Sequence, residues 1–257
     1  MSPLLSAKDL SWDIADSAIL QDISLSLQQG ELLGIIGPNG AGKSSLLQML
    51  AGITQADKGE LCLHDRPYTQ FDRRSFAQAL SYLEQDAQVN WPLLTEKVIE
   101  LGRSPHLSAY GSLSEADRLA VQEAISVTGI QHLTGRNVSS LSQGEKMLVA
   151  LTRVFATQAD IILADEPVAA LDPYHQLLIM ELLHSHSKKP GAAAIVVLHD
   201  LGLAARFCDR LLLMSAGRIV SAGAPENVLC AENLREFYRI LCYSDFSQAL
   251  IQPLERL

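Results

Sequence analysis

Glycine, lysine and serine stand at a characteristic spacing in the segment Gly37-Pro38-Asn39-Gly40-Ala41-Gly42-Lys43-Ser44. Glycines here allow successive backbone N–H groups to face one concavity, and a helix that begins there adds partial positive charge. Such a loop can hold a polyphosphate. We expect Lys43 to reach the β- and γ-phosphates of a nucleotide, Ser44 to bind Mg²⁺ through its hydroxyl, and Ser45 to donate to the α-phosphate.

Two adjacent carboxylates end the apolar run Ile161-Ile162-Leu163-Ala164-Asp165-Glu166. Such a run is typical of a buried parallel strand, and ligands bind at the carboxyl ends of these strands. Neighbouring residues of a strand point in opposite directions, so both acids face one ligand only if the chain bends. Pro167 favours a bend at Glu166. We therefore expect Asp165 to bind Mg²⁺ and Glu166 to orient and deprotonate a water molecule.

The segment Leu141-Ser142-Gln143-Gly144-Glu145 lies between these two motifs in the sequence. Ser142 precedes Glu145 by three residues and an apolar helical pattern follows, which together indicate a capping box. Taken alone, the segment could be only the start of a helix. Its place between the phosphate loop and the acidic strand end favours a functional interpretation as well.

Strands and helices alternate around these motifs, which predicts a mostly parallel sheet and an α/β fold. The phosphate loop follows the buried strand Leu32–Ile36 and opens a helix, the context that such a loop needs. Further strands are expected at 4–12, 19–27, 59–63, 80–83, 160–165 and 194–198, with a hairpin of 211–215 and 218–222. Further helices are expected at 95–102, 114–128, 141 to about 157 and 173 to about 188. The last helix is expected to begin at 201.

The composition excludes several classes of protein. A net charge of −9 argues against a nucleic-acid surface, because phosphate contacts need a basic patch. No apolar stretch approaches the roughly 18 residues of a membrane span, and no secretory signal is evident. The four cysteines lack metal-ligand spacing, which indicates reduced thiols. We expect His184 and His186 to be solvated and to hold no metal.

In this order, the three motifs resemble those of the ATP-binding cassette (ABC) ATPases, and the resemblance covers nearly the whole chain. The middle motif is similar to the family signature, commonly Leu-Ser-Gly-Gly-Gln. Ser142 and Gly144, which meet the nucleotide in that family, match it. Gln143 and Glu145 depart from it, which leaves the hydrolysis rate open. The resemblance implies a single domain over residues 1–257, an α/β P-loop NTPase core with an N-terminal antiparallel β part, a helical subdomain at about 86–158 and a C-terminal extension at 224–257.

The resemblance also implies roles outside the three motifs. Gln85 matches a glutamine that touches Mg²⁺ and senses the membrane partner, and His199 matches a histidine that contacts the γ-phosphate. Asp172 ends Ala169-Ala170-Leu171-Asp172, which is similar to the loop that signals between two active sites. Trp12, the only aromatic residue before the phosphate loop, is the best candidate to stack on adenine, with ordinary strand packing as the alternative.

Members of the family associate head to tail, so that ATP lies between the phosphate loop of one copy and the signature of the other. One copy of each motif therefore implies a homodimer, with ATP and Mg²⁺ as cofactors. In transporters of this family, the helical subdomain contacts the two permease subunits.

A narrower resemblance involves Leu101-Gly102-Arg103-Ser104-Pro105-His106 and the stretches 198–204 and 223–238. These look like ATPase subunits of bacterial importers of iron-siderophores, haem or cobalamin, in that order of expectation. Such a subunit would work with a periplasmic or lipoprotein substrate-binding protein, peripherally on the cytoplasmic face of the inner membrane. The alternative is a soluble ABC ATPase of iron-sulfur cluster assembly or the ribosome. A DNA-repair ATPase would need a long coiled coil that the sequence lacks.

Overall fold

The computed structural model describes residues 2–15, 17–85, 92–108, 111–246 and 249–256. Its centre is a six-stranded sheet, which from one edge to the other consists of β10 (Arg218–Gly223), β9 (Arg210–Ser215), β3 (Leu32–Ile36), β8 (Ala193–Val197), β7 (Ile161–Asp165) and β6 (Leu80–Leu83). Neighbouring strands run parallel except for the β9–β10 hairpin. Strands β3, β7 and β8 are buried along their whole length, as the apolar runs in the sequence predicted.

Successive residues of these buried strands pack into two different cores. Ile161 and Leu163 of β7 belong to one core, whereas Ile162 and Ala164 belong to the other. This alternation follows from the two-residue period of a strand. The first core also contains α1 (Lys43–Leu50) and the inner face of a second, antiparallel sheet. That sheet has the order β2 (Ser17–Leu27), β1 (Leu5–Ile14), β4 (Lys58–Leu63) and β5 (Arg66–Pro67).

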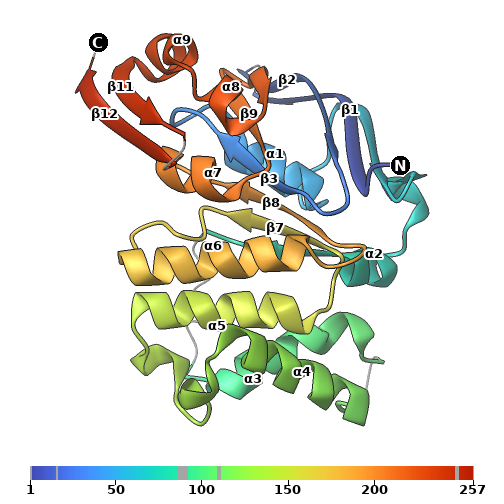
Figure 1. The fold of residues 1–257 in the computed structure, drawn as a ribbon. Coiled ribbons are helices and arrows are strands. Elements are labelled where there is room, and N and C mark those ends of the chain that lie inside the picture. Colours follow the sequence, from blue (N-terminus) through green and yellow to red (C-terminus); the bar gives the residue numbers. More distant parts are fainter. Residues whose placement is uncertain (1, 16, 86–91, 109–110, 247–248, 257) are drawn as a thin grey trace.

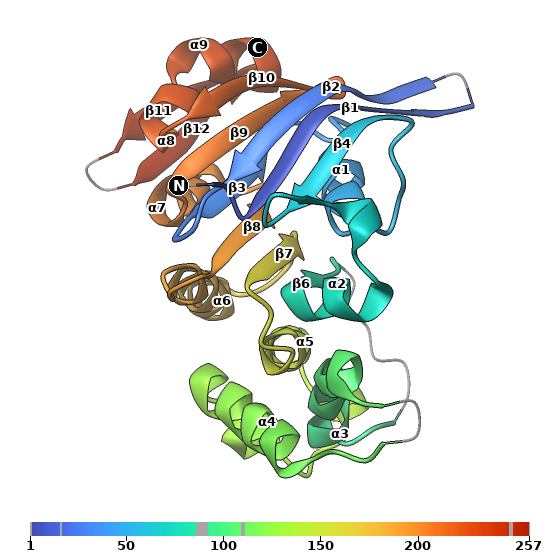
Figure 2. The same cartoon turned by 90° about the vertical axis from the view of Figure 1, so that its right-hand side faces the viewer.

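Helices form the other side of the molecule. The second core contains residues of α5 (Gln143–Ala156), α6 (Pro173–Ser187) and α7 (Leu201–Phe207). Helices α3 (Thr95–Glu100) and α4 (Glu115–Thr128) pack on α5. In Figures 1 and 2, α5 lies between α6 and the α3–α4 pair. Helices α3, α4 and α5 thus form a helical layer that stands away from the sheets. Among the described residues, no helix has both the length and the apolar character needed to span a bilayer.

Most of the expected elements are present with ends shifted by a few residues, and the α/β fold class is confirmed. The expectation that the last helix begins at Leu201 was wrong. The C-terminal part contains α8 (Pro225–Val228), α9 (Ala231–Asn233) and the hairpin β11 (Ile240–Asp245) with β12 (Leu250–Arg256). Helix α2 (Arg73–Ala79) was not predicted from the sequence. The expected start of the helical subdomain at residue 86 lies outside the described residues.

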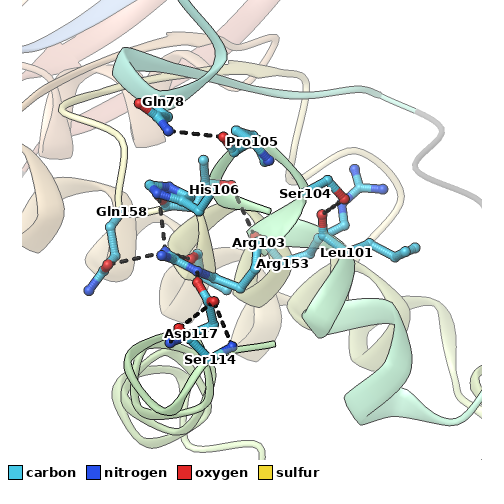
Figure 3. A network of polar contacts seen from close by, with 12 residues as sticks. Gln78, Leu101, Arg103, Ser104, Pro105, His106, Ser114, Asp117, Arg153 and Gln158 are labelled. Carbon is cyan, nitrogen blue, oxygen red and sulfur yellow. Dashed lines mark hydrogen bonds and ion pairs between the residues drawn. The ribbon is translucent and has the colours of Figure 1, made fainter. Parts of the chain in front are cut away.

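A buried arginine holds the helical layer together (Figure 3). The 3₁₀ segment η2 (Leu101–His106) follows α3 and carries Arg103. The Arg103 side chain donates from Nε to Oδ1 of Asp117 at 2.9 Å, at the start of α4. It also donates from Nη1 to the backbone oxygen of Ala156 at 2.8 Å, at the end of α5. One guanidinium group therefore joins three helical segments.

Segment η2 is also bonded to helix α2, through two of its backbone carbonyls. Arg74 of α2 donates to the carbonyl oxygens of Pro105 at 2.9 Å and His106 at 2.6 Å. Gln78, one turn further along α2, donates to the Pro105 oxygen at 2.9 Å (Figure 3). Because α2 leads directly into β6, these bonds connect the helical layer to an edge of the central sheet.

Candidate functional site

A cavity of about 410 Å³ lies where the carboxyl ends of β3, β6, β7 and β8 meet. The residues that line it come from the phosphate loop after β3 and from single positions beyond the other three strands. They are Asn39, Gly40, Ala41, Gly42, Lys43, Ser44, Ser45, Gln85, Glu166 and His199. Since ligands of α/β sheets bind at this end of the strands, the structure brings together candidate residues that are far apart in the sequence.

The phosphate loop wraps around the amine of its own lysine. Lys43 is 5% exposed, and Nζ donates to the carbonyl oxygens of Gly37 at 2.9 Å and Pro38 at 3.1 Å. Burial lowers the pKa of the Lys43 amine, while the nearby carboxylates of Glu166 and Asp165 act in the opposite direction. A buried ammonium group that donates to backbone carbonyls is suited to bind an anion that enters the loop.

Asp165 is buried at the end of β7 and directed at the start of α1. The Ser44 hydroxyl donates to its Oδ1 at 3.1 Å, and the Tyr82 hydroxyl donates to its Oδ2 at 3.3 Å. Burial raises the pKa of the Asp165 carboxyl, and the Ser44 hydrogen bond partly offsets this. A divalent cation beside the carboxylate would favour its charged form. The oxygens of Ser44, Asp165 and Gln85 are the hard donors that Mg²⁺ takes, so these residues fit such an ion.

The chain bends at Glu166, as expected, although the backbone there is left-handed rather than the extended form that a following proline favours. Strand β7 ends at Asp165, and Glu166 adopts a φ of +48°, which residues other than glycine rarely adopt. This bend places the Glu166 carboxylate on the cavity wall. Gln85 donates from Nε2 to Oε2 at 2.7 Å, and Nε2 of His199 contacts Oε1. Both oxygens of this carboxylate therefore have a partner within the site.

Three of the candidate residues that do not line this cavity lie at the starts of helices α5 and α6. Ser142 caps the N-terminus of α5: its hydroxyl accepts from the backbone N–H of Glu145 at 3.3 Å, and the Glu145 side chain accepts from the Ser142 backbone at 2.7 Å. The predicted capping box is therefore confirmed. Gly144 lies in the first turn of the same helix, and Asp172 caps α6. Within one copy of the chain, the signature residues are not part of the phosphate site.

Trp12 lies one strand away from the phosphate loop. It is half-buried on β1 and pairs with Leu20 of β2. Leu20 in turn packs under the loop, since a Cβ atom at Gly42 would lie 3.0 Å from its side chain. Trp12 packs partly against the core and is not among the cavity-lining residues. Its contact with adenine stays a prediction.

Two polar contacts and the burial of one histidine were not predicted from the sequence. The contact of Tyr82 with Asp165 depends on β6 lying next to β7. His175 contacts Asp172 at 2.6 Å. His186 was expected to be solvated but is 9% exposed and stacks on Phe155, with ring centroids 5.6 Å apart. Burial lowers the pKa of His186 to about 4.

A phosphate loop between β3 and α1, with a buried aspartate at the end of β7, defines a P-loop nucleoside triphosphatase. A sequence model described as ABC transporter matches residues 20–169. The chain therefore belongs to the ABC transporter family, and it is an ATPase that binds ATP.

Known proteins similar to the chain agree with this assignment. The hemin import ATP-binding protein HmuV of Pseudomonas aeruginosa is 39% identical over 240 residues, which cover 91% of this chain and 92% of that protein. The cobalamin import ATP-binding protein BtuD of Halobacterium salinarum is 35% identical over 231 residues, which cover 90% of this chain and 58% of that protein. Among solved structures, cbiO1 of Clostridium perfringens, part of the ABC transporter complex cbiONQ, has a TM-score of 0.79 at 27% identity, with 91% and 93% of the two chains covered.

Proposed function

We propose that the chain is the ATP-hydrolysing subunit of an ABC importer and that its cargo is haem. The observation that carries the proposal is the convergence of Lys43, Ser44, Glu166 and His199 in one cavity. The HmuV similarity over nearly the full length of both proteins supports import, and it favours haem over the iron-siderophore first expected from the sequence. It also favours an importer over a soluble ATPase of iron-sulfur cluster assembly or the ribosome.

In this proposal the residues of the cavity have different roles in ATP hydrolysis. Lys43 exchanges the carbonyls of Gly37 and Pro38 for phosphate oxygens, and the loop N–H groups bind the rest of the polyphosphate. Ser44, Asp165 and Gln85 would hold Mg²⁺, which would supply positive charge next to the phosphates.

Glu166 is the general base in the same scheme. It takes a proton from the attacking water, a role that requires an oxygen within hydrogen-bond distance of that water. His199 orients the Glu166 carboxylate through their contact and faces the γ-phosphate from the cavity wall. Trp12 stacks on the adenine base.

The proposed working unit is a head-to-tail homodimer. Ser142 and Gly144 do not line the cavity of their own chain, so they reach a nucleotide only if it is bound by a second copy. Asp172 lies on the same face and contacts the second copy. The helical layer then binds two permease subunits on the cytoplasmic face of the bacterial inner membrane, and a periplasmic or lipoprotein binding protein delivers the cargo to them.

Growth of a deletion strain on haem as the only iron source tests the proposal. We expect poor growth that returns with the wild-type gene but not with Lys43→Ala. Normal growth on haem with a defect for an iron chelate or cobalamin would reassign the cargo. Normal uptake of all three, with co-purification on ribosomes or an iron-sulfur scaffold, would establish the soluble alternative.

A further inference from the structure

His175, in the first turn of α6, contacts the residue that caps this helix. Its Nδ1 lies 2.6 Å from Oδ2 of Asp172. Because a carboxylate can only accept, Nδ1 is the donor. The backbone N–H of His175 donates to the other carboxylate oxygen, Oδ1, at 3.1 Å. The backbone bond alone is enough to cap α6, so the ring contact is an additional restraint on Asp172.

The same imidazole lies against the first turn of α5. A Cβ atom at Gly144 would lie 2.6 Å from Cγ of His175 and 2.7 Å from both Cδ2 and Nδ1. The ring thus occupies the space that a side chain at position 144 would need. Tyr174 borders the ring from another side in an edge-on contact, with centroids 5.3 Å apart. Figure 1 shows α5 and α6 side by side, so their first turns meet through this ring.

Asp172 and Gly144 belong to the two segments that the proposed dimer presents to its second copy. The Asp172 side chain is 57% exposed, whereas the His175 side chain is 20% exposed. The carboxylate is therefore available to a partner, while the ring behind it is held by the fold. A shift of Asp172 moves the ring, and the ring cannot move toward α5 without displacing Gly144, because packed side chains leave no free space.

We propose that His175 is a positioning residue that fixes Asp172 and Gly144 relative to each other, so that a second copy of this chain meets both segments as one preformed surface. The proposal rests on the head-to-tail dimer of the proposed function. It assigns His175 no contact with the nucleotide. Its effect is on closure of the dimer rather than on ATP binding by one copy.

ATP-dependent dimerisation in a Glu166→Gln background separates these two effects. His175→Asn keeps a hydrogen-bond donor at the δ position, whereas His175→Phe keeps a ring without a donor. We expect the Asn variant, which keeps the bond to Asp172 but loses the ring beside Gly144, to be impaired less than the Phe variant. We expect the Phe variant to need on the order of tenfold more ATP for half-maximal dimerisation, the effect of losing one hydrogen bond to a charged group. Analytical ultracentrifugation measures dimerisation, and a fluorescent ATP analogue at low protein concentration measures binding to the monomer.

The monomer measurement distinguishes positioning from a merely structural role. We expect equal nucleotide affinity in the parent and both variants. A parallel loss of affinity and thermal stability in the Phe variant would overturn the proposal, and so would dimerisation of that variant at the parental ATP concentration. Equal impairment of the Asn and Phe variants would overturn the role of the Asp172 contact.

Ser142→Arg in the same assay tests the dimer itself. If that variant dimerises normally, the head-to-tail arrangement of the proposed function is wrong. If it is blocked while both His175 variants dimerise normally, only the role of His175 is wrong.

Discussion

Gln85 donates a hydrogen bond of 2.7 Å from Nε2 to Oε2 of Glu166, a residue 81 positions away in the sequence. The amide lies beyond β6 and the carboxylate beyond β7, so the bond spans two neighbouring strand ends. It orients a carboxylate whose other oxygen contacts His199. A shift of the Gln85 side chain therefore changes the position of the Glu166 carboxylate.

Glu166→Gln should separate nucleotide binding from hydrolysis. The amide has nearly the shape of the carboxylate but cannot accept a proton, so we expect hydrolysis to slow by about 10²- to 10⁴-fold. ATP affinity should stay close to wild type, and the ATP-bound dimer should accumulate. Phosphate release and gel filtration with ATP measure the two effects. Near-normal turnover would remove Glu166 from the mechanism.

Lys43→Ala should weaken ATP binding itself. The variant leaves the phosphate charge to backbone N–H groups and Mg²⁺, and we expect a loss of about 1.5–3 kcal/mol, the scale of a hydrogen bond to a charged group. Calorimetric titration with ATP measures it. Lys58→Ala, which removes an exposed lysine from β4, is the matched control and should bind normally. Equal affinities in the two variants would contradict the role of Lys43.

Trp12→Ala should weaken ATP by about 1–3 kcal/mol if the indole stacks on adenine, with little change in the maximal rate. Trp12→Phe keeps an aromatic face and should retain most of the affinity. If a correctly folded Ala variant binds ATP like wild type, Trp12 has only a packing role on β1.

Two inactive variants should restore each other when mixed. Lys43→Ala disables the phosphate loop of its own chain, and Ser142→Arg disables the signature offered to the partner. In a mixed dimer, one site combines an intact Lys43 with an intact Ser142, so we expect ATPase activity to return. The activity of each variant alone is the baseline. A mixture no more active than that baseline would argue against the head-to-tail site.

Asp117 should make the helical layer sensitive to acid. Hydrogen bonds from Ser114, then the bond from Arg103, lower the pKa of the Asp117 carboxyl from 3.8 to about 2. A folded-state pKa below the unfolded value means that the unfolded chain binds the proton more readily. The stabilisation is therefore complete above about pH 4 and is lost as the pH falls toward about 2. Asp117→Asn should remove this dependence from urea unfolding curves, whereas Glu115→Gln, at an exposed position of the same turn, should keep it. Identical pH profiles for both variants would contradict the assignment.

Much of the site could be predicted because its motifs encode local geometry. The glycines and Lys43 define the loop by their spacing, and Pro167 indicates the bend that exposes Glu166. An apolar run followed by an acid identifies the carboxyl end of a strand, and parallel strands present these ends together. Eight of the ten lining residues of the cavity were therefore expected from the motifs themselves, whereas Gln85 and His199 were expected from the resemblance to ABC ATPases.

Contacts that depend on the order of strands or the packing of helices could not be predicted. The Tyr82 hydrogen bond to Asp165 requires β6 beside β7, and the His175 contact with Gly144 requires α5 beside α6. Helix α2 is short, and the C-terminal hairpin is mostly exposed, so neither has a strong apolar period. Tertiary packing rather than local propensity determines these parts.

The bonds from α2 to η2 end on main-chain oxygens rather than on side chains. Every amino acid at positions 105 and 106 offers such an oxygen, whereas only a few side chains can replace the donors Arg74 and Gln78. The donor side of this contact, on α2, therefore tolerates fewer substitutions than the acceptor side, on η2. Over evolutionary time, the side chains at 105 and 106 can vary without loss of these bonds as long as the backbone keeps its path, whereas Arg74 and Gln78 can be replaced only by the few residues that donate from the same position.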